Sequence, residues 1–487
     1  MSMSFLPVMA FAMLLGGGGG FDALDLLPAE QYWQVKNVAV NVDGMLRQLP
    51  SSDAETPDVS RQIENLGSAI PKVRDAAGEE IAAHGSAVIP QLRDASDSSD
   101  PEVAARAREL IHRLESNRQA GAIRRLMAIR TLGELEDERA LEVLRRLQPS
   151  RKPFESEYAE RAVARIEGRP WRRAAQRGES DVWRLPESCG LVAEARLFDQ
   201  PGADVGSLHD AVRKAMPMLQ AMGGGAEDPM RMIATKLIEV FEKTGNLRVD
   251  SVVAGMTEDI DEGSGKLVVI FRGVYNAPAF SQWLQDEGTA ADDGGRILRP
   301  DEEVGIAMPS DRHLAILITP GRDNLDESRA MLAGLKRREK PLERNAKMTA
   351  LVRKVAPASF VWARGTIPRS IRDEPAFGNT FSDIAFDATQ EDGVVSMSLE
   401  AEGPDADQVR AFSAQLDAQL QTAKTQLQQM AQMGPMAGMF QPVTELLESI
   451  RIGSKQKTMK VTGSFKPDLM SLAAPWIGIA PMMQAID

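Results

Sequence analysis

The side chains best suited to covalent or metal chemistry are few in this chain of 487 residues. Cys189 is the only cysteine, so neither an intramolecular disulfide nor a thiolate metal cluster can form. The four histidines, His84, His112, His209 and His313, are scattered, and no HExxH or His-x-His spacing pairs them. A nucleophilic Cys189 would need a histidine within reach. The sequence therefore predicts no catalytic residue, no metal site and no cofactor site.

Two short motifs resemble binding loops without completing them. Asp259 to Gly265 is as acidic as a calcium loop, but Gly263 replaces the third acidic ligand and Ile270 stands where the bidentate glutamate belongs. This run predicts a hairpin turn. Gly223 to Gly225 lacks the preceding strand and the following Lys-Ser/Thr of a phosphate loop, so we expect it to join two helices.

Charge argues against binding to nucleic acid. The formal net charge is -13, so the average surface repels a phosphate backbone. One basic stretch, Gly168 to Gly178, contains an aromatic residue, Trp171. We interpret residues 169–182 as a solvated linker whose Trp171 docks on a neighbouring domain, because groove binding needs a more extended basic field. No nucleic-acid partner is expected.

The elements that would position any site begin with amphipathic helices between residues 60 and 168. A helix that begins at Pro71 and ends at Gly85 is followed by one that begins just after it and by another that begins at Pro101. A second set echoes the first, with a helix that ends at Gly133. Matching the two glycines gives a period of roughly 48 residues, at the long edge of the HEAT and armadillo range. The pattern predicts a short α-solenoid that presents a binding surface.

Particular motifs support this interpretation. The segment IPKVRDAAGEEIAAHGSAVIPQLRDA, followed by DPEVAARARELIHRLE, resembles HEAT repeats of bacterial proteins. That resemblance implies a stacked helix-pair scaffold used for protein contacts, with no shared activity. The array, residues 59–168, is only about two units long, and its loop from Gln148 to Glu155 is longer than its counterpart, so we expect it to lean on the rest of the chain. An ordinary helical bundle is the alternative.

The amino-terminal residues bear on localisation. Phe5 to Leu15 has the length of a signal-peptide apolar core, is too short to cross a bilayer, and is followed by a glycine run within residues 1–20. No basic residue precedes it. We expect a periplasmic or secreted protein without a transmembrane span, with a cytoplasmic protein as the alternative. Residues 21–58 predict a small β-containing unit with a strand from Asn37 to Asp43 and a polar linker, or a helix that begins at Phe21.

Residues 183–487 predict a mainly antiparallel α+β domain. Polar or glycine-rich turns join neighbouring β runs, and we expect helices on one face of the sheet. Apolar residues from Val409 to Met430 step by three and four and predict a long amphipathic helix, and residues 324–355 predict a bridging helix. The expected strands are 191–198, 247–256, 266–274, 303–308, 313–319, 360–367, 384–389, 394–401, 450–453 and 458–465.

The order hairpin, helix, hairpin occurs more than once in this domain. It suggests an internal duplication with halves at 183–322 and 356–475. Leu185 to Ser188 and Asn345 to Met348, each ahead of a strand, lie in regions similar to uncharacterised exported proteins of environmental bacteria. That resemblance implies export and no known activity. The fold class is therefore multidomain, α plus α+β.

Two functions from different classes follow. The sequence favours a non-enzymatic protein–protein interaction or scaffold protein that binds a protein partner through the HEAT-like array. The alternative is an envelope enzyme, hydrolase-like, whose site uses dispersed Asp, Glu or His residues of the α+β domain. Converging carboxylates or a deep polar pocket around His313 would favour the enzyme.

Overall fold

The protein combines helices with a large antiparallel sheet, as the sequence predicts, in two compact units. The computed structural model describes residues 21–49, 57–84, 88–150, 152–169, 171, 180–196, 229–257, 265–321, 323–372, 380–391, 394–432 and 444–465. Residues 27–171 and 227–246 form a helical unit, and residues 1–26, 172–226 and 247–487 form a sheet unit. The chain therefore passes between the units four times, which differs from the sequential boundaries expected. The apolar segment 1–20 and the glycines 223–225 lie outside the described residues.

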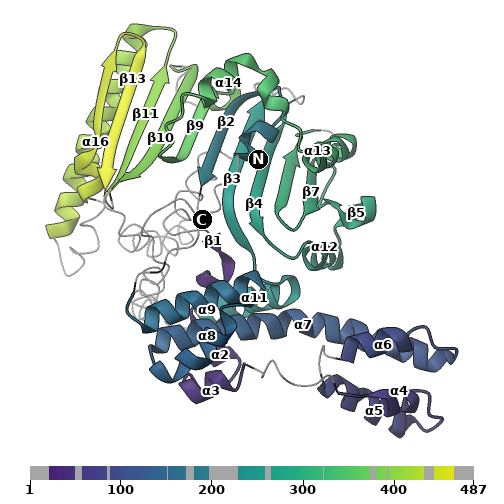
Figure 1. The fold of residues 1–487 in the computed structure, drawn as a ribbon. Coiled ribbons are helices and arrows are strands. Elements are labelled where there is room, and N and C mark those ends of the chain that lie inside the picture. Colours follow the sequence, from purple (N-terminus) through teal and green to yellow (C-terminus); the bar gives the residue numbers. More distant parts are fainter. Residues whose placement is uncertain are drawn as a thin grey trace. The chain divides into compact units, whose positions relative to one another are not determined.

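The helical unit is organised around one long helix (Figure 1). Its described elements are α2 (Ala29–Val35), α3 (Val42–Leu46), α4 (Ser60–Asn65), α5 (Pro71–Ala83), α6 (Ile89–Ala95), α7 (Pro101–Leu135), η3 (Glu138–Ala140), α8 (Leu141–Leu147), α9 (Pro153–Ile166) and α11 (Pro229–Thr244). The first part of α7 packs with α4, α5 and α6 around Ile81, Leu92 and Leu110. The rest of the unit packs on the later turns of α7, so this helix is shared by both halves of the predicted array.

The α7 helix corrects the predicted break in the array. The helices expected to begin at Pro101 and to end at Gly133 are one helix of 35 residues, capped at its start by the Asp100 side chain. Gly133 does not end it, because α7 continues to Leu135 and the left-handed residue is Glu136, with φ 52°. A Cβ at Gly133 would lie 2.7 Å from the Ala162 Cα. This glycine therefore allows α7 and α9 to pack closely.

Residues 27–49 join the helical unit and do not form the strand expected over Asn37 to Asp43, because they form α2 and α3. The alternative of a helix that begins at Phe21 is also wrong, since Phe21–Asp22 is a short strand and Ala23–Leu26 a 3-10 helix, both in the sheet unit. Asn37 has φ 53°, which interrupts an extended chain, and the Asn41 side chain accepts the Gly44 N–H at 2.7 Å to start α3. Buried Trp33 donates its indole N–H to the Thr131 hydroxyl at 2.8 Å, which ties α2 to α7. The burial of Trp33 outweighs the alternation of apolar and polar residues that predicts a strand.

The sheet unit contains thirteen described strands. They are β1 (Phe21–Asp22), β2 (Cys189–Arg196), β3 (Arg248–Thr257), β4 (Leu267–Val274), β5 (Ala290–Asp292), β6 (Ile297–Arg299), β7 (Val304–Ser310), β8 (His313–Ile318), β9 (Ser359–Thr366), β10 (Asp383–Glu391), β11 (Val394–Glu402), β12 (Arg451–Lys455) and β13 (Thr458–Phe465). Their order is β12-β13-β11-β10-β9-β2-β3-β4-β8-β7-β6-β5, and β1 pairs with β3. The ten expected strands all occur within a few residues of their predicted bounds, whereas short β1, β5 and β6 were not expected.

Helices cover both faces of the sheet, so the expectation of helices on one face is wrong. The described helices of this unit are η1 (Ala23–Leu26), η4 (Asp181–Arg184), α12 (Ala277–Asp286), η6 (Asp293–Gly295), α13 (Leu325–Arg337), η7 (Pro341–Arg344), α14 (Ala346–Val352), α15 (Arg369–Arg372) and α16 (Ala406–Gln432). Along β8, Leu317 packs with η4, α13, η7 and α14, whereas Leu314 points to the opposite face and packs with α12. Register places Ala401, which packs with α16, on the same face as Leu314.

Two further predictions concern the helices of this unit. The amphipathic helix expected from Val409 to Met430 is confirmed as α16. The single helix expected over 324–355 is instead three elements, α13, η7 and α14, because Arg338 has φ 57° and Pro341 follows it. No helix among the described residues is both long enough and apolar enough to cross a membrane.

Candidate functional site

The most unusual polar arrangement is a row of side chains across four neighbouring strands of the sheet unit. In register, Arg196 of β2 lies opposite Ser251 of β3, Ser251 opposite Arg272 of β4, and Arg272 opposite His313 of β8. Directly opposed residues of an antiparallel pair share a face. These four residues, which we call the charged row, lie at one end of their strands and on the face that η4 and α13 cover. The register shift beside Ser251 is a β-bulge at Asp250.

Asp181 of η4 neutralises the β4 and β8 end of the charged row. Its carboxylate is 2% exposed and lies 3.3 Å from the His313 Nε2, 2.5 Å from the Arg184 Nε and 3.7 Å from the Arg272 Nε. Burial raises the pKa of Asp181, but His313 and the two arginines outweigh burial and lower this pKa below its ordinary value. Asp181 is therefore an anion held between three basic side chains.

Glu194 of β2 neutralises the other end. Its carboxylate is 1% exposed and accepts three donors: the Ser180 hydroxyl at 2.8 Å, the Trp362 indole N–H at 3.0 Å and the Arg196 guanidinium at 3.0 Å. Trp362 stands directly opposite Glu194 on β9. Removing any of these donors would leave part of the buried carboxylate without a hydrogen-bond partner, at a cost in stability.

The same face continues into a third ion pair on β9 and β10. Arg364 is 8% exposed, contacts the Asp387 carboxylate, and donates to the Phe386 carbonyl at 2.7 Å. Asp387 also accepts the Ser359 hydroxyl at 3.1 Å. Three carboxylates therefore lie along this face, each held by arginine: Asp181 of η4, Glu194 of β2 and Asp387 of β10.

Two polar groups of the row, the Ser251 hydroxyl and the His313 Nε2, have no hydrogen-bond partner, although His313 has Asp181 nearby at 3.3 Å. The Ser251 side chain is 1% exposed. Buried hydroxyls are normally paired, because an unpaired one costs roughly 1–3 kcal/mol. Arg196 and Arg272 stand on either side of it in register. The hydroxyl is therefore an unfilled donor between two cationic side chains.

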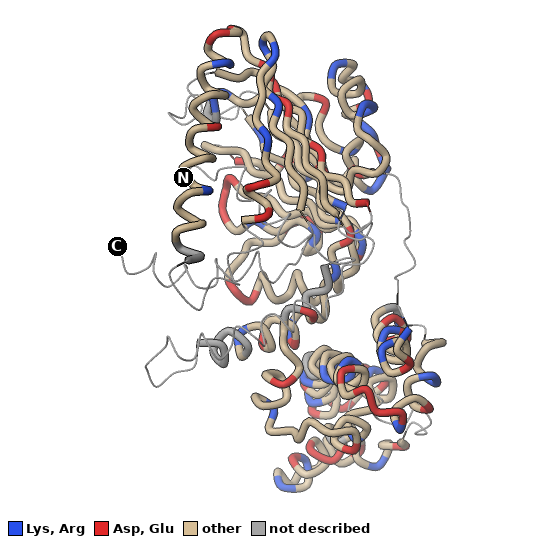
Figure 2. Tube along the Cα trace, turned by 90° about the vertical axis from the view of Figure 1, so that its left-hand side faces the viewer, with Lys and Arg blue, Asp and Glu red and all other residues tan. Residues whose placement is uncertain are grey.

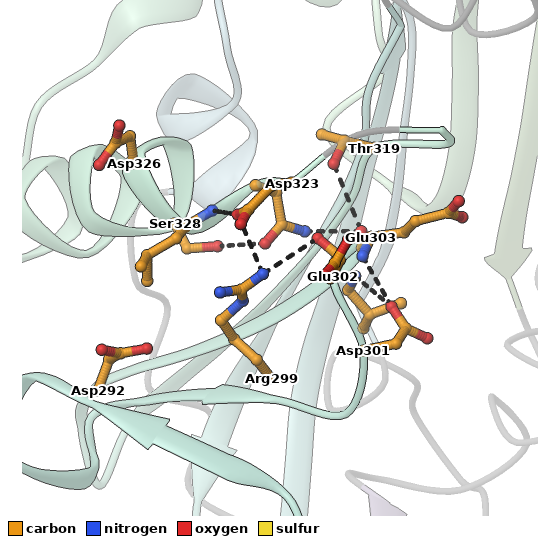
Figure 3. Close-up of polar contacts among 12 residues, drawn as sticks. Asp292, Arg299, Asp301, Glu302, Glu303, Thr319, Asp323, Asp326 and Ser328 are labelled. Carbon is orange, nitrogen blue, oxygen red and sulfur yellow. Dashed lines mark hydrogen bonds and ion pairs between the residues drawn. The ribbon is translucent and has the colours of Figure 1, made fainter.

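A second polar cluster lies at the end of β8 that is farther from His313 (Figure 3). This cluster joins the β6–β7 turn to the start of α13. The Glu303 carbonyl accepts the Asn324 side-chain N–H at 2.6 Å and the Thr319 backbone N–H at 2.9 Å. Arg299 donates to the Asp323 carboxylate at 3.0 Å. Asn324 and Thr319 are fully buried. These bonds join backbone segments to one another, so we interpret this cluster as structural.

The residues singled out from the sequence are not brought together. Cys189 is buried at the far end of β2 from the charged row, and burial raises the pKa of its thiol to about 12, which leaves little thiolate for chemistry at neutral pH. His84 and His112 belong to the helical unit, and His209 lies outside the described residues. His313 lies beside the Asp181 carboxylate, as described above. Within the described ranges, no group of three or more His, Cys, Asp or Glu is placed to hold a metal ion.

The structure describes only parts of the loops and the linker that were singled out from the sequence. Strands β3 and β4 form the expected hairpin around residues 259–265, although residues 258–264 lie outside the described ones. Trp171 belongs to the helical unit, where the Arg161 guanidinium of α9 lies 5.9 Å from its ring centre. Residues 172–179 are outside the described ones.

The helical unit exposes an apolar pair on its outer helix. Ile70 is 61% exposed and Val73, one turn later on α5, is 36% exposed, whereas Ala77 and Ile81 of the same helix are buried. Acidic and basic residues are interspersed along the helices of this unit (Figure 2). Many of them pair, as Arg113 does with Glu79 at 2.9 Å. Charges of both signs are therefore mixed over the described residues of this unit.

The charged row could not be found from sequence periodicity alone. Its members are 117 residues apart between Arg196 and His313, and each is a single polar residue inside an otherwise ordinary strand. The available signal was weak: a basic residue or histidine at one end of each of three predicted strands. Strand order and register are needed to align them.

Comparisons with known proteins add little. No family model and no curated protein matches the chain. Among solved structures, crystal form III of TP0453 aligns with 61% of this chain and 99% of its own, at 10% identity and a TM-score of 0.31. Crystal form I aligns with 61% and 98%, at 7% identity and a TM-score of 0.29. Likenesses this low carry no argument about the fold or the function.

Proposed function

We propose that this protein is a non-enzymatic scaffold whose helical unit binds another protein along α5. The observation that carries this proposal is the exposed pair Ile70 and Val73. They are two of the three exposed large apolar side chains of the described residues, and they lie together at the start of α5, Ile70 as its N-cap and Val73 in its first turn. Solenoid ends that are not used for contact normally carry a polar outer face. An apolar pair there favours contact with a partner.

The geometry of the sheet unit is compatible with a supporting role. Asp181, Glu194 and Asp387 are each held by arginine, and the cluster around Asn324 joins backbone segments. Such networks rigidify a body that carries a binding unit.

Affinity purification from the native host would test the proposal with matched variants. Ile70→Glu and Val73→Glu should each lose a reproducible partner that the wild-type chain recovers, because a charge cannot be buried against an apolar partner surface. Val40→Glu is the control, since Val40 is 39% exposed in the same unit and stands apart from α5. Equal recovery by all four proteins would refute α5 as the binding surface.

The finer description of the fold belongs to this proposal. We infer a HEAT-like solenoid in the helical unit and an internal duplication in the sheet unit. Outward from the central β2–β9 pair, the order is β3, β4, β8, β7 on one side and β10, β11, β13, β12 on the other. In each half a helix, α12 or α16, follows the first hairpin. Alignments of homologues should then match residues 183–322 to 356–475; unrelated conservation patterns in the two halves would contradict duplication.

A second candidate, an envelope hydrolase, has one observation in its favour. Asp181 lies 3.3 Å from His313, and a carboxylate that orients an imidazole is half of a general-base arrangement. If this pair is catalytic, His313→Gln should abolish hydrolysis of ester or peptide substrates while Cys189→Ala leaves it unchanged. Turnover that survives His313→Gln would exclude this assignment.

We also propose export to the periplasm or secretion, on the basis of the apolar run from Phe5 to Leu15. Intact-mass measurement of the protein from its native host tests this. Loss of the residues up to the glycine run is the expected result, and Met1 retained on cytosolic protein would overturn export.

A further inference from the structure

We propose that the charged row binds a small oxyanion, a carboxylate or a phosphate group, over Ser251. The first step is geometric. Neighbouring strands are about 4.8 Å apart, so Arg196 and Arg272 flank Ser251 on either side in a row. An oxyanion above the serine would accept its hydroxyl and guanidinium N–H groups from both sides, which is the arrangement that arginine uses to recognise carboxylates and phosphates.

The second step is the unfilled donor. The Ser251 hydroxyl is 1% exposed and has no partner, although it could rotate toward any acceptor that was near it. A bound oxygen atom supplies that acceptor. The register also places no apolar residue between the hydroxyl and the two guanidinium-bearing positions, since all three stand directly opposite one another.

The third step is charge. Asp181 pairs with Arg184 and Arg272, and Glu194 pairs with Arg196, so three guanidinium groups are gathered at the row. Guanidinium groups in a partly buried cluster attract an anion strongly, because attraction there is less screened than in water. The Glu194 carboxylate accepts a hydrogen bond from the Arg196 Nη2. Because a guanidinium has five N–H donors, Arg196 can donate to Glu194 and to an anion together.

The fourth step is access. The side chains of Arg196, Arg272 and His313 are 27%, 16% and 21% exposed, so the row reaches solvent at the ends of its strands even though Ser251 is covered. A small ion can approach from that end. His313 adds a further donor beside Arg272, opposite it in register.

Isothermal titration calorimetry on the full chain tests the proposal with inorganic phosphate and acetate, each against chloride at constant ionic strength. Saturable binding of at least one anion is expected. Arg196→Gln should weaken it at least about tenfold, which corresponds to the loss of one strong charged contact. Arg410→Gln, on the exposed surface of α16, is the matched control and should bind as the wild type does.

Ser251→Ala separates binding from folding. It removes only the unpaired hydroxyl, so the melting temperature should be unchanged or raised, while anion affinity should fall about threefold to tenfold. Phosphate bound without acetate would assign a phosphate ligand, and acetate without phosphate a carboxylate ligand; both support the site. Saturable binding of neither anion, or equal affinity in Arg196→Gln and Arg410→Gln, would overturn it.

Discussion

Replacing Glu194 by glutamine, a side chain of nearly the same size and shape, should strongly destabilise the sheet unit. The carboxylate is fully buried and accepts from Ser180, Trp362 and Arg196 at 2.8, 3.0 and 3.0 Å. Glutamine keeps one acceptor oxygen and turns the other into a donor, which then faces donors. It also leaves Arg196 without its counter-ion.

The magnitude follows from those contacts. Hydrogen bonds to a charged group contribute about 1.5–3 kcal/mol each, and removing one partner of a buried ion pair costs about 3–5 kcal/mol. Because Arg196 is 27% exposed and water can solvate part of it, we expect the lower end, about 3 kcal/mol. For a unit of this size that lowers the melting temperature by on the order of 5–10 °C.

Differential scanning calorimetry of the full chain measures this shift against a matched control. Glu400→Gln removes a carboxylate of the same sheet face, but one that is 49% exposed and pairs with Lys460 at 2.8 Å. Surface pairs contribute about 0–1 kcal/mol, so this control should barely move the transition. If Glu194→Gln and Glu400→Gln shift the melting temperature equally, the buried contacts of Glu194 do not stabilise the sheet unit as proposed.

Three other predictions follow from single residues. Gly365 has φ +139°, and a Cβ there would lie 2.0 Å from the Gly190 carbonyl oxygen. Gly365→Ala should therefore separate β2 from β9 and lower the free energy of unfolding, measured by chemical denaturation, by about 3 kcal/mol or more. The control Gly453→Ala, with open space around it, should lower this free energy by about 1 kcal/mol or less. Gly133→Ala should lower the free energy of unfolding of the helical unit by about 1–3 kcal/mol, because its Cβ would meet Ala162. The control Gly121→Ala, on the exposed side of α7, should leave that free energy unchanged or raise it. A Gly133→Ala protein as stable as the wild type would contradict the close packing. Burial raises the pKa of Cys189 to about 12, so the folded state retains the thiol proton that the unfolded state releases near pH 9. The free energy of unfolding should therefore fall as pH rises from 9 to 10, by up to about 1.4 kcal/mol more in the wild type than in Cys189→Ala. Identical pH slopes in the two proteins would refute that pKa.

Much of the secondary structure could be predicted from local patterns. The ten expected strands and the amphipathic helix that became α16 depend on period-2 and period-3.6 patterns, which survive because those segments bury one face. Prediction failed where tertiary contacts outweighed the local pattern. Asn37 to Asp43 alternates like a strand, yet α2 and α3 form because Trp33 is buried against Thr131. Gly133 reads as a helix end but provides the close approach of α7 to α9.

The sequence by itself determined most of the element types, the scarcity of cysteine and histidine, and the net charge of -13. Those depend on residue identity and on neighbours within a few positions. Tertiary structure alone decided that α11, inserted between β2 and β3, belongs to the helical unit, and that helices cover both faces of the sheet. It also decided that Arg196, Ser251, Arg272 and His313 form one row, because strand register, and not distance along the chain, sets which side chains meet.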